Sequence, residues 1–280
     1  MSVPPDPPGT GWRATPLELA TDDRFGGRWT SLRSASREWL WTNEGAAALR
    51  RGVRPGDPFV DAGGVEECFP TVRGTPDHGD AWSRPWSEAP GDMVSEVEVP
   101  AGRLRRRLTG GGPTIVVEYT ITGRPGQPFV HAVHALLDVS VAARIVTGEP
   151  DAAVVVDGTA GGRPFAWPVL EGEDLSTFGR EDGTAICAVL RGCAGAVVVD
   201  GDHALGLAWA AGETSPQLPL GLMVWRNLGG WPVGAPYRSI GIEPMVGTAA
   251  DVADTAGAAR LDASGEAAWT LRLAAWSRHR

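Results

Sequence analysis

The sequence predicts an all-β protein, and two observations support that prediction. Short apolar or alternating segments, rich in Val, Ile, Thr and Trp, recur between Gly, Pro and Asp residues at lengths typical of strands. Few segments keep the helical period of about 3.6 residues, so the pattern indicates a sandwich or barrel instead of alternating strands and helices. The chain has 280 residues, 42% of them hydrophobic, which is enough to bury a sizeable core.

The expected strands follow one another along almost the whole chain. They are residues 28–32, 38–41, 94–99, 114–122, 129–139, 153–156, 185–190, 196–199, 205–210, 222–225 and 267–276. Residues 248–260 fit either a short helix or a polar loop. Residues 1–11 are rich in Pro and Gly, which predicts a disordered N-terminal tail. Because no linker divides the remainder, we expect 12–280 to form a single β-sandwich domain.

The charged residues exclude several classes of function. The net charge is −9, and all 25 basic residues are Arg. This balance argues against a nucleic-acid partner, which needs a basic face. The lack of Lys excludes a Lys Schiff base or the Lys of a phosphate-binding loop. No run of apolar residues is long enough for a membrane span, so we expect no membrane partner.

The cysteines and the N-terminus bear on location and metal binding. Cys68, Cys187 and Cys193 are widely spaced, which predicts free thiols in a reducing cytoplasm instead of disulfides or a zinc site. The N-terminus has no basic region followed by an apolar one, so it does not predict a signal peptide. No other spacing of acidic and His residues suggests a metal site, and we expect neither a metal nor a cofactor.

Residues 61–86 are unusual for a loop, because charged, His and Trp side chains crowd a Gly- and Pro-rich segment. A long structured loop is often functional. Its candidate ligand-binding residues are Glu67, Asp77, His78, Trp82 and Arg84. Two of these have a plain alternative. For His78 it is an exposed turn, and for Trp82 it is a cap on the sandwich instead of a stacking contact with a ligand.

Two further segments place ionisable side chains in apolar surroundings. His131 and His134 are three residues apart, and because side chains alternate along a strand, they are expected to point to opposite faces. Only one of the two can therefore serve a given site. Glu243 lies in the apolar run 237–247, where burial should raise its pKa, as suits a general base. The alternative for Glu243 is a structural ion pair with an Arg such as Arg238.

Four blocks of sequence, in this order, carry a resemblance to a known family. They are GGVEECFPTV (63–72), PDHGDAWSRPW (76–86), PFVHAVHALLDVS (128–140) and YRSIGIEPMVG (237–247). Together they resemble the bacterial aldose 1-epimerase, or galactose mutarotase, family. The resemblance implies a large antiparallel β-supersandwich with a site in a concave face.

The resemblance also implies roles for particular residues. His134 matches the family's acid, which protonates the pyranose ring oxygen, and Glu243 matches the base, which takes the proton of the C1 hydroxyl. His78 matches a His that contacts the sugar, and His131 and Trp225 are further candidates for substrate contacts. The implied ligand is a small-molecule carbohydrate or a carbohydrate-like compound, bound by a monomer or a homodimer.

Two other functions remain open on the sequence. The same acid and base could drive dehydration, epimerisation or an addition-type cyclisation of a hydroxylated natural product, since a fold does not determine a function. A protein that binds carbohydrate without chemistry is the third possibility.

Overall fold

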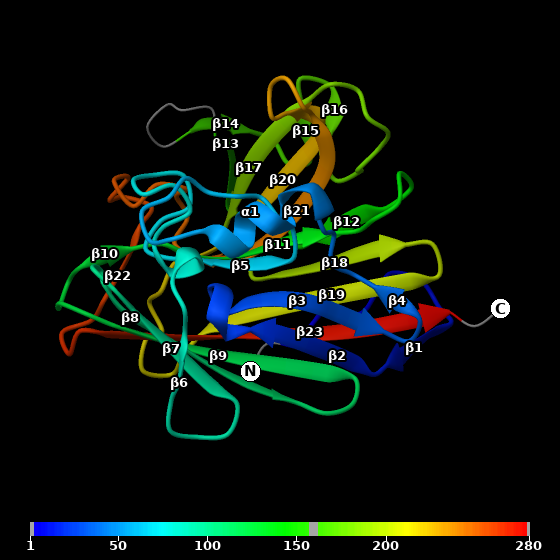
Figure 1. Cartoon of the computed structure of the whole chain (residues 1–280). Helices are drawn as coiled ribbons and strands as arrows, with labels where there is room; N and C mark the ends of the chain where they lie inside the picture. Colours follow the sequence, from blue (N-terminus) through cyan, green and yellow to red (C-terminus); the bar gives the residue numbers. More distant parts are fainter. Residues whose placement is uncertain (1–2, 157–161, 279–280) are drawn as a thin grey trace.

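Two large antiparallel sheets dominate the computed structural model, which describes residues 3–156 and 162–278 (Figure 1). The strands of the first, sheet A, are β1 (Trp12–Thr15), β6 (Ser87–Glu88), β7 (Val94–Val99), β8 (Gly102–Gly110), β9 (Thr114–Thr122), β12 (Arg144–Thr147), β18 (Gly195–Asp200), β19 (His203–Ala211) and β23 (Glu266–Arg278). Their order is β12-β18-β19-β23-β9-β8-β7-β6, with β1 also paired to β23.

Sheet B carries the candidate site. Its strands are β2 (Leu17–Asp22), β3 (Arg28–Ser34), β4 (Arg37–Glu38), β5 (Val65–Cys68), β11 (His131–Leu137), β13 (Ala152–Val155), β14 (Arg163–Phe165), β17 (Ala185–Arg191), β20 (Leu220–Trp231) and β21 (Tyr237–Val246). Their order is β14-β13-β17-β20-β21-β11-β5-β3-β2, with β4 paired to β3. Strands β5, β11, β21 and β20 are therefore neighbours, although they come from distant parts of the chain.

The remaining elements are short. They are two-stranded pairs of β10 (Pro128–Phe129) with β22 (Ala259–Arg260) and of β15 (Val169–Leu170) with β16 (Glu173–Asp174), the helix α1 (Ala47–Gly52), and the 3₁₀ turns η1 (Asp23–Phe25), η2 (Glu44–Ala46) and η3 (Ala81–Ser83). In Figure 1, α1 and its adjoining loops lie beside β5 and β11. Within the described residues, no helix is long and apolar enough to cross a membrane.

Alternation along the strands builds the core between the two sheets. In β23, Ala267, Trp269, Leu271 and Leu273 are buried, and the residues between them are more exposed. This is the pattern of a strand with one face on the core and one toward solvent. Strand β11 differs, because all seven of its residues are buried. One face of β11 faces sheet A, and the other lies under loops.

The structure confirms most of the expected strands and changes three details. Residues 237–246 form the regular strand β21, although their Glu and Pro interrupt the apolar pattern. Residues 248–260 form turns and β22, with no helix. Residues 3–11, expected to be disordered, lie against sheet A, where Pro4 and Pro7 are buried and the carbonyl of Pro8 accepts a hydrogen bond from Trp12. Proline has few conformations to lose, so this short contact can order the segment. Residues 1–2 of the predicted tail lie outside the described residues.

Candidate active site

A cavity of about 280 Å³ opens on sheet B. Its polar lining consists of Asp61, Arg73, Asp77, His78, His134 and Glu243, and its aromatic lining consists of Phe59, Trp225 and Trp231. The cavity lies on the face of sheet B turned away from sheet A, because His131, which points the other way from β11, contacts Tyr119 and Trp269 of sheet A. The prediction that His131 and His134 occupy opposite faces is confirmed.

Strand register brings His134 and Glu243 together. On β11 and β21, Ala132 pairs with Met245 and Leu136 pairs with Gly241, so Glu243 lies opposite His134 on the same face. The Nε2 atom of His134 is 3.8 Å from Oε1 of Glu243. This distance is too long for a hydrogen bond, so both groups keep their hydrogen-bonding capacity for a ligand.

Unsatisfied polar atoms of this cavity point to a ligand. Among the described residues, Nδ1 of His134 and Oε2 of Glu243 are buried without a hydrogen-bond partner. Buried polar atoms in native proteins are nearly always paired, and exceptions often mark functional positions. The alternative for Glu243, an ion pair with Arg238, is wrong, because Arg238 donates to the carbonyls of Val139 and Ser140.

The environment of Glu243 suits a general base. Burial raises the pKa of this carboxyl to about 6, with a further increase from the Asp61 carboxylate, while His134 and Arg73 act in the opposite direction. A base is most effective when its pKa is near the working pH. The side chain is 1% exposed, and desolvation is therefore the leading cause of the shift.

Gly241 makes room for this carboxylate, which leads to a testable prediction. A Cβ atom at Gly241 would lie 2.7 Å from Oε1 of Glu243 and 2.9 Å from Cβ of Trp225. Gly241→Ala should therefore displace the Glu243 carboxylate. For the general-base role proposed below for Glu243, it should lower kcat by about 10- to 100-fold, since small misplacements of a reacting group are costly. Steady-state kinetics check this, with Gly148→Ala, where a Cβ would meet nothing within 4 Å, as the control. Equal kcat values in the two variants would contradict the prediction.

His78 reaches the cavity from the loop of residues 61–86. Its backbone has a φ of 59°, in the left-handed region that side chains rarely adopt. The ring stacks on Phe59 with centroids 3.5 Å apart and lies edge-on to His134 at 5.1 Å. An uncommon backbone conformation held by packing is frequent at functional sites. The Oδ1 atom of Asp77 lies 3.2 Å from Nδ1 of His78.

The structure brings some of the predicted site residues together and separates others. His134, Glu243, His78, Asp77 and Trp225 line the cavity. Trp82 does not line it, but its ring packs edge-on against Phe59, with centroids 4.9 Å apart, and so supports the Phe59–His78 stack. Arg84 lies outside the cavity, with Nη2 3.5 Å from Oδ1 of Asp80.

Glu67 and His131 lie between the sheets and not in the cavity. Glu67 accepts hydrogen bonds from Arg106 at 2.9 Å and Tyr119 at 3.0 Å, and its Oε2 lies 3.1 Å from Nε2 of His131. The indole of Trp269 donates to Nδ1 of His131. The structure does not bring these two residues, which we predicted to contact substrate, to the cavity, because each points to the core face of its strand. They form a buried polar network that joins the two sheets.

Four of the polar and aromatic residues that line the cavity are not among those predicted from the sequence: Phe59, Asp61, Arg73 and Trp231. Asp61 and Arg73 lie in the segment 61–86, which was singled out for its charge, and this density was the available signal for both. Phe59 precedes the segment, and Trp231 ends β20, where nothing in the local sequence indicates a site. Only the pairing of β20 with β21 and the path of the loop bring these residues to one place.

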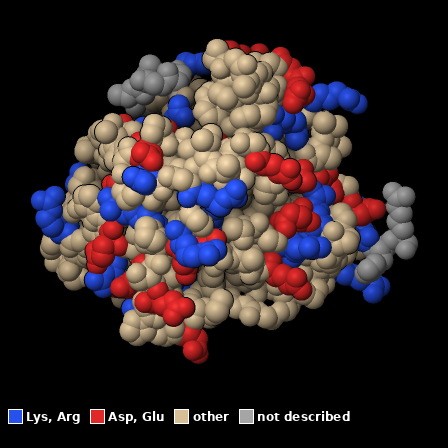
Figure 2. Space-filling model, in the orientation of Figure 1, with Lys and Arg blue, Asp and Glu red and all other residues tan. Residues whose placement is uncertain are grey.

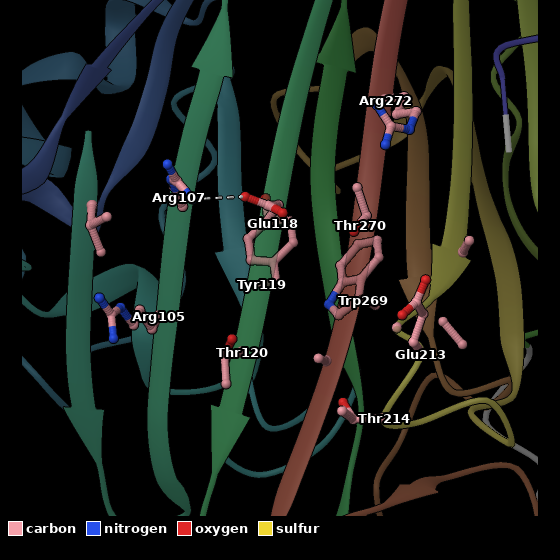
Figure 3. A pocket seen from close by; sticks show the side chains of 15 residues that line it. Arg105, Arg107, Glu118, Tyr119, Thr120, Glu213, Thr214, Trp269, Thr270 and Arg272 are labelled. Carbon is pink, nitrogen blue, oxygen red and sulfur yellow. Dashed lines mark ion pairs between the residues drawn. The ribbon is translucent and has the colours of Figure 1, made fainter. Parts of the chain in front are cut away.

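A larger hollow, of about 590 Å³, lies on the solvent-facing side of sheet A (Figure 3). It is lined by exposed charged side chains such as Arg107 and Glu118, whose Nη1 and Oε2 atoms are 3.8 Å apart, and by Thr120 and Thr270. None of its lining residues is a His. It therefore lacks a pair of groups such as His134 and Glu243, and the smaller cavity on sheet B is the better candidate for chemistry. No group of three or more metal-ligating side chains occurs within residues 3–156 and 162–278.

Comparisons with known proteins give matches only at the level of structure. No protein-family model and no curated protein matches the sequence. A solved structure from Synechocystis covers 100% of this chain and 99% of its own, at 14% identity and a TM-score of 0.67. A galactose mutarotase-like protein from Lactobacillus casei matches 95% of this chain and 100% of its own, at 16% identity and a TM-score of 0.60. A galactose mutarotase related enzyme from Lactobacillus acidophilus matches 95% and 98%, at 11% identity and a TM-score of 0.64.

These likenesses define the fold, because they extend over nearly the whole of both chains. The chain has the all-β, galactose mutarotase-like fold that the sequence resemblance implied. Identities of 11–16% do not extend the likeness to an activity. The activity must be argued from the site.

Proposed function

We propose that this protein is an aldose 1-epimerase-like isomerase that interconverts the anomers of a sugar by general acid–base catalysis. The observation that carries the proposal is the pair of His134 and Glu243, which face one cavity 3.8 Å apart without a hydrogen bond between them. The fold supports it, since structures with this fold include proteins named as galactose mutarotase-like. We further propose that the enzyme works in the cytoplasm, which agrees with its three free cysteines.

The geometry suits the opening of a hemiacetal ring. The ring oxygen and the C1 hydroxyl oxygen are bonded to the same carbon, so an acid and a base side by side can each reach one of them. Glu243 takes the proton of the C1 hydroxyl as His134, in its protonated form, gives a proton to the ring oxygen. The bond between C1 and the ring oxygen breaks, and the C1 carbonyl forms.

Reversal of these steps completes the reaction. Rotation about the C1–C2 bond presents the other face of the carbonyl. The hydroxyl released in ring opening attacks C1 and gives its proton to His134, while Glu243 returns its proton to the C1 oxygen. No atom or electron is gained or lost overall. His78 and Trp225, on the wall of the cavity, are placed to contact the sugar.

Magnetisation exchange between anomers, measured by NMR at low buffer concentration, tests the proposal. The panel is glucose, galactose and their 6-phosphates. We expect the protein to accelerate exchange of at least one sugar, with a rate that falls as pH drops below about 6, where Glu243 becomes protonated. The proposal would be contradicted if the folded protein accelerated anomer exchange neither for these sugars nor for any further aldose tested.

A further inference from the structure

The cavity on sheet B carries an excess of negative charge. Asp61, Asp77 and Glu243 contribute three carboxyl groups, and Arg73 is the one Arg among the described residues that line it. The side chains of Asp77 and Arg73 influence each other. Burial by itself raises the pKa of Asp77, but His78, and to a smaller extent Arg73 and His134, lower it below its usual value. Asp77 has His78, 3.2 Å away, as its basic partner. Among the described residues, neither Asp61 nor Glu243 has so close a basic partner.

Asp61 and Glu243 have no cationic Arg partner. Within residues 3–156 and 162–278, no Arg lies within ion-pair distance of either carboxyl group, although 25 Arg occur in the chain. Glu243 is 1% exposed, and its Oε2 atom has no hydrogen-bond partner. Elsewhere in the molecule, the buried acids Glu66 and Glu67 are each paired with a buried Arg. Glu243 has only His134, 3.8 Å away, as a nearby basic group, and Asp61, which is partly buried, has none among the described residues. Two carboxyl groups with so little cationic compensation favour a cationic ligand.

Neighbouring groups hold the Asp61 carboxylate in place. Its Oδ2 accepts a hydrogen bond of 2.6 Å from the hydroxyl of Tyr237, and its Oδ1 accepts one of 3.2 Å from the backbone amide of Gly63. Burial, together with Asp61, raises the pKa of Tyr237, so the phenol keeps its proton and acts as the donor. A carboxylate has about four acceptor positions, and the two that remain are free for a ligand that donates hydrogen bonds.

Aromatic rings pack around Tyr237, whose hydroxyl donates to this carboxylate. Trp231 lies edge-on to Tyr237 at 5.8 Å and to Trp225 at 6.2 Å between ring centroids, and Trp41 stacks on Tyr237 at 5.2 Å. The indole of Trp225 donates to the hydroxyl of Ser239, which fixes its orientation. Trp225 and Trp231 line the cavity, and Trp231 is 38% exposed. Aromatic faces beside a carboxylate are typical of sites that bind an organic cation.

We propose that the substrate of this site is an amino sugar, whose protonated amine contacts the Asp61 carboxylate beside Trp225 and Trp231. The inference deepens the proposed function, since it names the substrate class of the same site. An ammonium group carries a positive charge that pairs with the Asp61 carboxylate. It also carries hydrogen-bond donors for the two remaining acceptor positions of that carboxylate. A phosphate or carboxylate substituent would meet like charges on Asp61 and Glu243 and is disfavoured.

Isothermal titration calorimetry of the wild-type protein tests the proposal without depending on turnover. The probes are 2-amino-2-deoxyglucose, 3-amino-3-deoxyglucose and 6-amino-6-deoxyglucose, each compared with glucose and, for the first, with N-acetylglucosamine. We expect at least one amino sugar to bind about tenfold or more tightly than glucose at low salt. This preference should shrink as salt is raised, because part of the attraction is between charges.

Variants separate the role of Asp61 from general effects. Asp61→Asn keeps an oxygen acceptor but loses the charge, and should bring amino-sugar affinity to within about twofold of glucose. Asp57 is exposed and lies shortly before Asp61 in the chain, so Asp57→Asn should keep the wild-type preference. Tyr237→Phe removes a donor to Asp61 but keeps its charge, and should keep a preference for the amino sugar. Circular dichroism of Asp61→Asn verifies that this variant is folded.

The outcomes distinguish the two proposals. Equal affinities for glucose and every amino sugar, or a preference that survives Asp61→Asn, would overturn the amino-sugar inference and leave the isomerase proposal standing. A preference for an amino sugar without faster anomer exchange would support the inference and overturn the isomerase proposal. Weak binding of all probes would overturn the inference as well, since a matched cation should be retained.

Discussion

Glu243→Gln is expected to lower the rate of anomer interconversion by about 10²- to 10⁴-fold, the usual contribution of a general base. Gln has nearly the shape of Glu but cannot accept the proton of the C1 hydroxyl. His134→Ala should cause a comparable loss, because it removes the group that protonates the ring oxygen. NMR exchange rates measure both effects, and circular dichroism verifies that the variants are folded. Wild-type rates in both variants would refute the assignment of the acid and the base.

The same substitution should make the protein more stable at neutral pH. Burial raises the pKa of Glu243 from its ordinary value of 4.5 to about 6. Below pH 4.5 the carboxyl is protonated in both the folded and the unfolded chain and has no net effect. Between pH 4.5 and pH 6 the carboxyl of Glu243 loses its proton in the unfolded chain but keeps it in the folded chain, so the free energy of unfolding falls as pH rises. Above pH 6 the buried carboxylate lowers the free energy of unfolding by about 2 kcal/mol.

Denaturant unfolding at two pH values measures this effect. We expect Glu243→Gln to raise the free energy of unfolding by about 2 kcal/mol at pH 8 and to change it little at pH 4. Glu88→Gln, on the exposed strand β6, is the matched control and should change neither value appreciably. A variant that is less stable than the wild type at pH 8 would show that the Glu243 carboxylate has a stabilising partner that this account omits.

Glu67→Gln should destabilise the protein by about 3–5 kcal/mol, the largest effect on stability that we expect. Arg106 and Glu67 are both fully buried between the sheets, and Nη1 of Arg106 lies 2.9 Å from Oε1 of Glu67. Removing the carboxylate charge leaves the guanidinium with only Asp23, which is partly exposed, as a charged partner. Urea unfolding measures the loss. Glu98→Gln, whose partner Arg103 is exposed, should cost no more than about 1 kcal/mol.

The effect of Glu67 should depend on pH in the opposite sense to that of Glu243. Burial by itself raises the pKa of Glu67, but His131 and Arg106 lower it below its usual value. A group with a lowered pKa stabilises the folded chain above the pKa of the unfolded state, and this contribution is lost as pH falls through the folded value. The difference between the wild type and Glu67→Gln should therefore decrease in acid. A difference that stays constant down to pH 3 would contradict this account.

The sequence by itself determined the fold class and part of the site. Short segments of β-branched and aromatic residues predicted the strands, because a strand with one buried face needs a period of two residues. The same two-residue period predicted that His131 and His134 point to opposite faces of their strand. Glu243 stood out because an acid in an apolar strand must be neutralised or paired. These are local properties, and each can be read within a few residues.

Tertiary structure alone decided which side chains meet. Register between β11 and β21 places Glu243 opposite His134, and no property of either strand specifies that register. Glu67 and His78 belong to one charged segment, yet Glu67 turns to the core while His78 reaches the cavity. Asp61 and Trp231 meet through Tyr237, which is more than a hundred residues from Asp61. Such contacts depend on the pairing of distant strands, which arises from the packing of the whole sandwich and not from local sequence.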